Sequence, residues 1–413
     1  MQISDDTKAI LLLTAPLMFG KSTNEVKLLT LKEYHQFAMF LNYIKKQPAD
    51  LLTPELDNIL NAYGKLDNTR IHQLLNRGFL LSQVLDYWQS RNIWVISRAD
   101  KTYPSNFKNR LKENAPAILY GCGNIDLLNM SGLAIVGSRN INDELIKYTI
   151  NIASLSAQAN QMIISGGAKG ADLAAMQGAL NAGGTVCGVL SDSLEKAALN
   201  AENRLPLQQN RLVLISACDP KSIFNAGNAM VRNKYIYALA NAGLIINADL
   251  NKGGTWAGAI EQLEKYRQIP IYIRSTDQMS DGLNALANKG ALPWKNPQFP
   301  EEFLDIFKVQ PPQLEPDTVQ HLFSENVMPT LPENEKSDVN IPPDEELFLC
   351  AKKLILNSLD KPRNDKEIAQ LLNVSPVQIK KWLERLIDEN IIIKTGRPVR
   401  YDMIENHKNF RLF

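Results

Sequence analysis

The sequence predicts an α/β protein with a Rossmann-like, doubly wound and mostly parallel sheet, with an N-terminal helical domain and a C-terminal winged helix-turn-helix. Three observations predict this class. In the middle of the chain, short runs of Val, Ile and Leu alternate with helical stretches, as expected of strands covered on both faces. Glycine-rich turns follow three of those runs. A proline-rich acidic stretch then precedes a helical C-terminal block.

Residues 1–92 are expected to form the helical domain. Thr30 and Glu33 have the spacing of a capping box ahead of an apolar-periodic stretch. Thr53-Pro54 predicts a second helix start, because Thr is a good N-cap and Pro fits the first helical position. Gly64 then predicts the end of that helix.

The Rossmann-like domain is predicted over 93–310. The expected strands are 133–136, 162–164, 185–190, 211–215, 244–247 and 269–273. The expected crossover helices are 144–159, 171–181, 228–241, 256–266 and 282–288. Gly121-Cys122-Gly123, ahead of the first of these strands, is interpreted as a plain loop.

The composition changes again after residue 310. Residues 311–343 contain seven prolines, and residues 311–350 contain nine acids and one lysine, which predicts a linker without a core of its own. Residues 344–413 predict a winged helix, in the order helix, helix, turn, helix and hairpin. Ser375-Pro376 opens its third helix as an N-cap followed by proline.

The charge balance restricts the class of protein, and the use of cysteine indicates its cellular compartment. The 45 Lys and Arg against 44 Asp and Glu exclude a uniformly basic chromatin-type protein, although a local basic surface is compatible with a neutral total. The four cysteines are widely spaced, which favours buried thiols of a reducing cytosol over disulfides. The apolar run at 9–19 is too short to span a bilayer. We therefore expect a cytoplasmic protein without a membrane partner, a metal or a cofactor.

The three glycine-rich turns predict a site for a polyanion. They comprise Gly137, Ser138 and Arg139; Ser165, Gly166, Gly167, Lys169 and Gly170; and Gly253, Gly254 and Thr255. In an open α/β sheet, ligands bind outside the carboxyl ends of the strands, where helix N-termini and backbone N–H groups favour phosphate. The hydroxyl and cationic side chains of these turns are expected to add donors. None of the turns matches a P-loop, so an ATPase of that class is not expected.

A fourth segment is expected to border the same crevice. Arg232, Asn233 and Lys234 lie near the start of a predicted helix that leads into the 244–247 strand. A solvated, charged helix start is the alternative interpretation.

These residues, in this order, resemble the DprA/Smf family of DNA-processing proteins. The family has a G-S-R turn, an S-G-x-A-x-G-x-D turn and an R-N-R helix start, which match 137–139, 165–172 and 232–234. The sequence departs from it at several positions: Lys234 replaces the second Arg, Met176 stands where the family usually has His, and Asn247 replaces the acid of the family's V-V-E-A strand. The third turn is also similar to a loop of the lysine-decarboxylase-like nucleotide-binding proteins.

The resemblance implies binding of single-stranded DNA, often as a homodimer, and its delivery to the recombinase RecA in natural transformation. It implies that the turns hold the sugar-phosphate backbone without chemistry, so no catalytic residue is expected. The alternative is a nucleotide-binding enzyme or sensor, with Glu261 near Thr255 as acid, base or ribose ligand. Transformation, recombination and defence against foreign DNA would use the same groove.

A further hypothesis places duplex DNA on the winged helix. Residues 351–404 contain 11 basic and seven acidic side chains. The candidate contacts on the third helix and the wing are Lys380, Lys381, Arg385, Arg397 and Arg400. Winged helices also bind proteins, which is the alternative role.

Overall fold

The protein is represented by a computed structural model that describes residues 3–19, 26–276, 279–309, 348, 351–352, 354–356, 358–359, 362–372, 374–388, 391–395 and 399–403. The chain divides into two compact units, Met1–Val319 and Gln320–Phe413, which are described separately. The predicted linker at 311–343 lies outside the described residues, and the predicted domain boundaries stay predictions.

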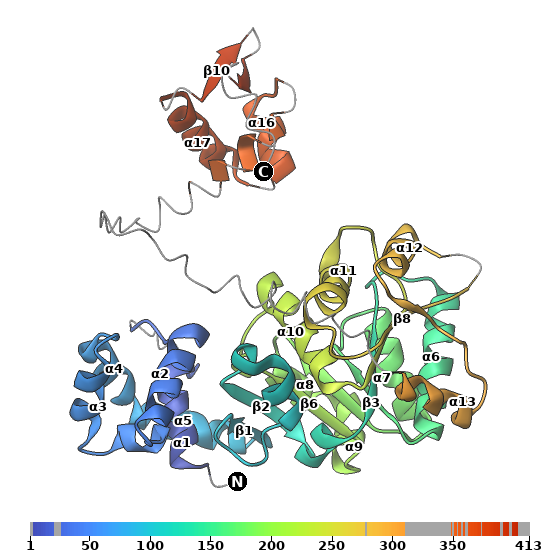
Figure 1. The fold of residues 1–413 in the computed structure, drawn as a ribbon, viewed down its shortest axis with the longest axis horizontal. Helices are drawn as coiled ribbons and strands as arrows, with labels where there is room; N and C mark the ends of the chain where they lie inside the picture. Colours follow the sequence, from blue (N-terminus) through green and yellow to red (C-terminus); the bar gives the residue numbers. More distant parts are fainter. Residues whose placement is uncertain are drawn as a thin grey trace. The chain divides into compact units, whose positions relative to one another are not determined.

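The first unit is built on a nine-stranded, mostly parallel sheet (Figure 1). Its strands are β1 (Ile93–Ser97), β2 (Ile118–Gly123), β3 (Gly132–Val136), β4 (Met162–Ser165), β5 (Val186–Leu190), β6 (Leu212–Ser216), β7 (Ala242–Ile245), β8 (Ile271–Ile273) and β9 (Leu292–Pro293). Their order is β1-β2-β6-β5-β4-β3-β7-β8-β9. All neighbours from β6 to β9 are parallel, whereas β2 is antiparallel to both β1 and β6. The predicted α/β fold class is confirmed.

The strand order places a topological switch point between β3 and β7. From β3 the chain proceeds through β4, β5 and β6 in one direction, and then returns to add β7, β8 and β9 on the other side of β3. The connections that leave β3 and β7 therefore diverge, and a crevice opens at the carboxyl ends of these two strands. The first predicted turn follows β3, and the residues of the third predicted turn form the start of α11 (Gly253–Ile260), the helix that follows β7.

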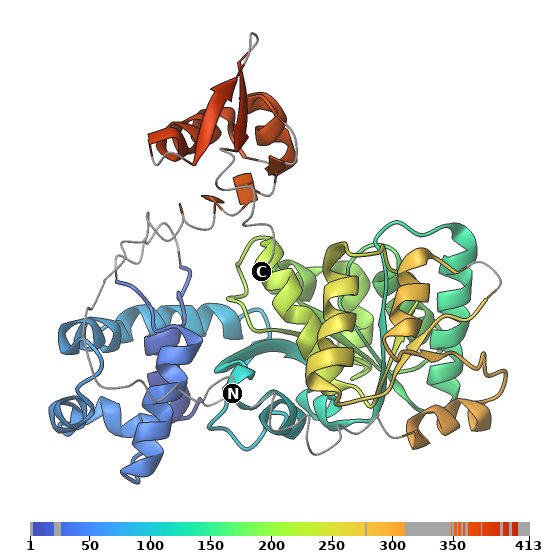
Figure 2. The same cartoon turned by 45° about the horizontal axis from the view of Figure 1, so that its top comes forward.

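Helices cover both faces of the sheet. Those of the α/β region are α6 (Asp143–Gln158), α7 (Ala171–Asn181), α8 (Leu194–Leu199), α9 (Ala201–Gln208), α10 (Ala226–Leu239), α11, α12 (Asp281–Asn288) and α13 (Pro300–Asp305), with shorter turns η2 (Phe107–Leu111), η3 (Lys112–Asn114), η4 (Ile125–Asn129), η5 (Glu261–Tyr266) and η6 (Ile306–Lys308). One core cluster joins the sheet to α6 and α7, and the other joins it to α10, α11 and α12. Helices α10 and α11, in yellow-green and yellow, lie side by side (Figure 2).

The N-terminal helices pack on the same sheet face as α6 and α7. They are α1 (Asp5–Thr14), α2 (Leu31–Tyr43), η1 (Pro48–Leu52), α3 (Leu56–Tyr63), α4 (Asn68–Leu75) and α5 (Gly78–Gln89). The apolar run at 9–19 supplies most of α1, whose Ile10, Leu11 and Leu13 are fully buried in this shared core. No described helix is long and apolar enough to cross a membrane.

Of the helix boundaries predicted in the N-terminal region, two hold and one is wrong. Thr30 and Glu33 form the complete capping box at the start of α2, and Gly64 ends α3 with a φ of 63°. Thr53, however, follows η1 as its C-cap, and α3 begins only at Leu56. Thr53 caps the C-terminal end of the 3₁₀ turn η1, and its hydroxyl donates to the carbonyl of Asp50.

The loop expected at Gly121-Cys122-Gly123 is instead the end of β2. Gly121 pairs with Trp94 of β1, and a Cβ on Gly121 would lie 2.4 Å from the Trp94 ring. The Trp94 indole Nε1 donates to the carbonyl oxygen of Gly123 at 2.9 Å. Glycine in this strand therefore makes room for an aromatic ring, a use that favours strand over loop.

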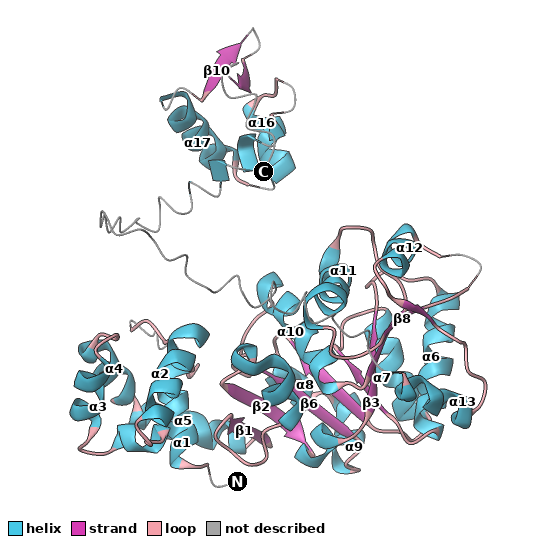
Figure 3. Cartoon of the chain, viewed as in Figure 1, coloured by secondary structure: helices cyan, strands magenta, loops and turns pink. Residues whose placement is uncertain are grey.

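The second unit contains helices and a hairpin, in cyan and magenta in Figure 3. Its named elements are α16 (Asp365–Leu372), α17 (Pro376–Asp388), β10 (Ile392–Thr395) and β11 (Arg400–Met403). The two strands are antiparallel, and residues such as Ile368, Ile379 and Leu383 form a core of their own. This order agrees with the predicted third helix and wing, while the assignment as a winged helix stays a prediction.

Candidate nucleic-acid site

A cavity of about 610 Å³ lies at the switch point between β3 and β7. The first and third predicted turns, the start of α7 and the first turns of α10 and α11 surround it. Of the predicted site residues, those that line it are Gly137, Ser138, Arg139, Arg232, Asn233, Gly253, Gly254 and Thr255. Those that do not line it are Ser165, Gly166, Gly167, Lys169, Gly170 and Lys234.

The first and third turns are tied to neighbouring backbone by their own polar groups. The backbone N–H of Ser138 donates to the carbonyl of Asn247 at 3.0 Å, and its hydroxyl contacts the same oxygen at 3.4 Å. The Thr255 hydroxyl donates to the carbonyl of Gly137 at 3.0 Å. Both hydroxyls were expected to face a ligand. Their contacts instead fix the shape of the cavity wall.

The second turn packs beneath the wall of the cavity. The buried Ser165 hydroxyl donates to the carbonyl of Ile135 at 2.6 Å, so this side chain links β4 to β3. Gly170 has a φ of +82°, and a Cβ there would lie 2.5 Å from the carbonyl oxygen of Arg139. A side chain at Gly170 would therefore be strained and would push the first turn out of place.

Asp172 and Arg232 form a buried ion pair behind the turns. Their Oδ2 and Nη1 atoms lie 3.4 Å apart, and the two residues are 5% and 7% exposed. The Asp172 carboxylate also accepts the backbone N–H groups of Gly137 and Ala168. Burial raises the pKa of Asp172, and Arg232 and these N–H donors oppose the rise. One carboxylate thus joins the first turn, the second turn and α10.

The Asp172–Arg232 ion pair changes the roles expected of the Arg232 guanidinium and of the backbone N–H of Gly137. Arg232 was predicted as a ligand cation, but its guanidinium is committed to Asp172 and to the carbonyl of Val189. The N–H of Gly137 was predicted to meet a phosphate, but it donates to Asp172. Arg232 lines the cavity as part of its frame, and its Nε is a buried donor without a hydrogen-bond partner in the described structure.

The other two residues of the fourth segment also bind protein groups. The Asn233 amide donates to the carbonyl of Gly254 at 2.7 Å, which links α10 to the start of α11. The Lys234 ammonium lies 3.7 Å from the Glu261 carboxylate. Glu261 is the acid or base proposed for the alternative nucleotide enzyme. It pairs with Lys234 and does not line the cavity.

Cations available to a ligand remain at the rim. Arg139 and Lys252 line the cavity, and exposed Lys169 lies on the second turn. None of the three forms a salt bridge within the described part of the chain. Lys252 is the N-cap of α11, and the first N–H groups of this helix donate no hydrogen bond to its side chain. The helix N-terminus adds positive potential on the same side of the cavity.

Sequence reasoning missed the apolar part of this rim. The Arg139 guanidinium lies 5.3 Å from the ring centroid of Phe224, which lines the cavity and is 55% exposed. Ile223 is 80% exposed beside it, and Met230 of α10 is another exposed lining residue. An Ile-Phe pair in a segment otherwise rich in Ser, Asn and Gly was the available signal.

In the second unit, the predicted duplex contacts differ in accessibility. Lys380 and Lys381 are exposed on α17. The Arg385 guanidinium lies 3.7 Å from the ring centroid of Phe348, and Arg400 donates to the carbonyl of Pro362 at 3.1 Å. Arg397 lies outside the described residues.

The fold and the cavity define a Rossmann-like α/β protein with a crevice at its switch point, whose rim carries cationic and apolar side chains. The family model of DNA recombination-mediator protein A matches residues 94–304. The chain therefore belongs to the DNA recombination-mediator protein A family.

Individual relatives agree with this assignment. The chain is 31% identical over 182 residues to DNA processing protein DprA of Streptococcus pneumoniae, covering 43% of this chain and 63% of that protein's length. It is 26% identical over 240 residues to Protein Smf of Borreliella burgdorferi, covering 57% and 74%. The X-ray structure of pneumococcal DprA superposes with a TM-score of 0.56 at 20% identity, over 75% of this chain and all of that one.

Proposed function

We propose that the cavity at the β3/β7 switch point binds single-stranded DNA. The observation that carries this proposal is the exposed Phe224 ring beside Arg139, in a crevice that Lys252 also lines. Neither cation forms a salt bridge with a described residue. Proteins that hold a single strand combine cations for the phosphates with aromatic rings for the bases. Membership of a DNA recombination-mediator family makes DNA the expected polymer.

In this proposal, different groups of the cavity contact the phosphates and the bases of the DNA strand. Arg139 and Lys252 contact phosphates, with Arg139 able to donate two hydrogen bonds to one phosphate. The N-terminus of α11 adds backbone donors. Phe224 stacks on a base, with Ile223 and Met230 extending the apolar surface. A base paired in a duplex has no face free for such stacking, so the arrangement favours single strands.

The alternative of a nucleotide enzyme has weaker support. Its proposed acid, Glu261, pairs with Lys234 at 3.7 Å and does not line the cavity. Asp172, which does line it, is buried in its pair with Arg232. Asp249 is the other acidic lining residue, so the cavity offers no pair of free carboxylates within the described chain.

Other parts of the proposal rest on family membership. We propose that the protein delivers the strand to RecA and that it acts as a homodimer. Duplex DNA binding by the second unit is proposed on the exposed Lys380 and Lys381 of α17. Natural transformation, recombination and response to foreign DNA are the processes that such a strand carrier serves.

The test is a titration of single-stranded, duplex and mononucleotide ligands across salt concentrations. We expect the full chain to bind a thymidine oligonucleotide with a log-log salt slope of about −0.7 per phosphate contacted, summing over several phosphates. A mononucleotide should bind far more weakly and with little salt dependence. Equal affinity for the mononucleotide and the oligonucleotide would instead support the nucleotide enzyme or sensor.

We also predict that Phe224→Ala weakens single-strand binding about fivefold or more, because stacking contributes roughly 1–3 kcal/mol per base. The salt slope should be unchanged, since the ring neutralises no phosphate. Phe224→Trp should retain affinity. Fluorescence anisotropy with a labelled oligonucleotide measures all three. An alanine variant that binds like the wild type would remove Phe224 from the interface.

A further inference from the structure

We infer that the N-terminal helical region positions the base-stacking surface of the crevice, with Lys221, Tyr87 and Glu195 as positioning residues. The element that it holds is the rim loop, defined as residues 217–225, which presents Ile223 and Phe224. This inference rests on the proposed function, because it assigns a purpose to the position of Phe224. Three sets of contacts carry it.

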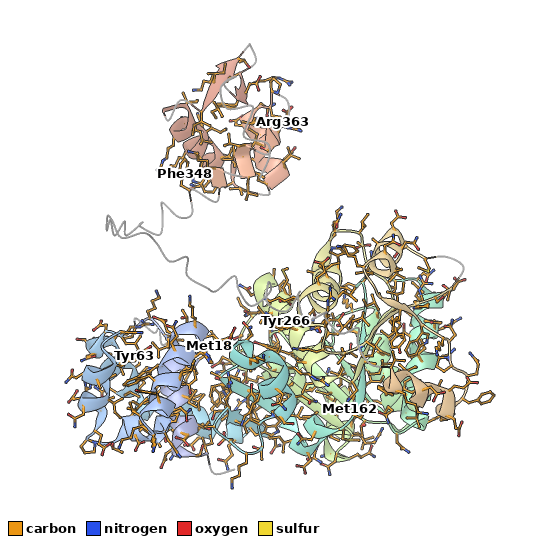
Figure 4. All side chains as sticks on the ribbon, in the orientation of Figure 1. Met18, Tyr63, Met162, Tyr266, Phe348 and Arg363 are labelled. Atoms are coloured by element: carbon orange, nitrogen blue, oxygen red, sulfur yellow. The ribbon has the colours of Figure 1, made fainter. Side chains whose placement is uncertain are left out.

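The first contact is made by Asp219, which is only 3% exposed in the rim loop. One carboxylate oxygen accepts the backbone N–H of Met18 at 3.2 Å, and the other accepts the N–H of Lys221 at 3.0 Å. The carbonyl of Asp219 also accepts the N–H of Ser222 at 2.8 Å. Met18, labelled in Figure 4, follows α1 and therefore ties the helical region to this turn.

The second contact is a cation on two aromatic rings. The Lys221 ammonium lies 4.0 Å from the ring centroid of Tyr87 and 5.8 Å from that of Phe19. The two rings meet edge to face, with their centroids 5.7 Å apart. Tyr87 belongs to α5 and Phe19 follows α1, so two parts of the helical region hold one lysine of the rim loop.

The third contact passes through Glu195 at the start of α8. Its carboxylate accepts the Tyr87 hydroxyl at 2.5 Å and the Arg91 Nε at 2.9 Å. Its backbone N–H donates to the carbonyl of Pro220 in the rim loop at 3.1 Å. A neighbouring N–H, that of Ser193, donates to the carbonyl of Ser222 at 2.8 Å. The rim loop is thus held through Tyr87 both directly and by way of Glu195.

The anchored part of the loop ends close to the proposed stacking ring. Only Ile223 separates Ser222 from Phe224, so their Cα atoms lie at most about 7 Å apart along the extended chain. Displacement of Ser222 therefore moves Phe224 relative to Arg139, whose guanidinium lies 5.3 Å from the ring. The helical region does not line the cavity. The contacts with the rim loop connect it to the ligand-facing side of the cavity.

A double-mutant cycle between Tyr87 and Phe224 tests this route. We expect Tyr87→Ala to weaken binding of a labelled thymidine oligonucleotide about threefold to fivefold, because coupled residues commonly show interaction energies of this size. In the Phe224→Ala background the same substitution should change affinity by less than about 1.5-fold, since no ring remains to be positioned. Tyr87→Phe keeps the ring under Lys221 and loses only the hydroxyl, so its effect should be intermediate.

The controls separate positioning from general damage. Phe79→Ala alters a 79% exposed aromatic residue of the same helix that makes none of these contacts, and it should leave affinity unchanged. If Tyr87→Ala does not fold, Lys221→Met enters the same cycle, because it keeps the aliphatic stem and removes the cation. Equal losses with and without Phe224, or no loss at all, would overturn the inference. If neither the wild type nor any variant binds the oligonucleotide, the proposed function itself fails.

Discussion

Replacing Arg139 and Lys252 together with alanine is expected to weaken single-stranded DNA binding about 100-fold at physiological salt. Hydrogen bonds to charged groups contribute roughly 1.5–3 kcal/mol each. These two cations form no salt bridge with an acidic side chain of the described chain, so no such partner competes with a phosphate for them. The salt slope should fall in magnitude by about 1.4, which corresponds to two phosphates at roughly 0.7 each. Both side chains are at the rim of the cavity, so the fold should be unaffected.

The matched control is Lys147→Ala, which removes an exposed cation from α6 away from the cavity lining. It should leave both affinity and slope unchanged. Lys169→Ala is an informative third variant, since Lys169 is exposed on the second turn but does not line the cavity. A double variant that keeps the wild-type affinity and slope would refute the backbone-binding role of the crevice.

Gly166→Ala is expected to destabilise the first unit by about 3 kcal/mol, the size of loss seen when a buried ion pair is broken. A Cβ at this position would lie 1.0 Å from Nη1 and 2.2 Å from Cζ of Arg232, and 2.6 Å from Oδ2 of Asp172. Both partners are more than nine-tenths buried, and the open space beside them is the cavity that they line. The guanidinium must leave the carboxylate, and Asp172 then remains as an uncompensated buried charge.

Thermal and urea unfolding of the full chain measure this loss. Gly78→Ala is the control, because a Cβ there meets nothing within 4 Å and its φ is not positive. We expect Gly166→Ala to weaken oligonucleotide binding as well, since Asp172 holds the N–H groups of Gly137 and Ala168. Retention of wild-type stability by Gly166→Ala would contradict the tight packing of Gly166 against this ion pair.

Much of the fold could be predicted because its signals are local. Buried strands such as β3 and β6 appear as continuous apolar runs, and the Thr30 capping box needs only four residues. Elements that depend on distant partners were missed. Gly121 is part of a strand because Trp94 crosses it, and α9 continues through Pro206. Neither fact is contained in a short window of sequence.

The binding site stays a prediction, and the structure changes the role expected of several of its residues. The first and third turns line the cavity at the switch point, whereas the second turn packs behind its wall. Arg139 and Lys252 also line it, although Lys252 was not singled out from the sequence. Glycine, serine and arginine have the same appearance in a sequence whether they face a ligand or a neighbouring turn. Only the fold shows that Arg232 faces Asp172. The sequence likewise contained no indication that Phe224 would lie beside Arg139 in the cavity.

The internal bonds of the turns have a consequence for the thermodynamics of binding. Ser138, Thr255 and Asn233 already join neighbouring backbone segments without any ligand, and Asp172 holds two further N–H groups. The wall of the crevice therefore loses little conformational entropy when a strand arrives, and the entropy cost of ordering falls mainly on the nucleic acid. Calorimetry should then find an entropy of binding that varies with the stiffness of the oligonucleotide, more unfavourable for flexible thymidine tracts than for stacked adenine tracts.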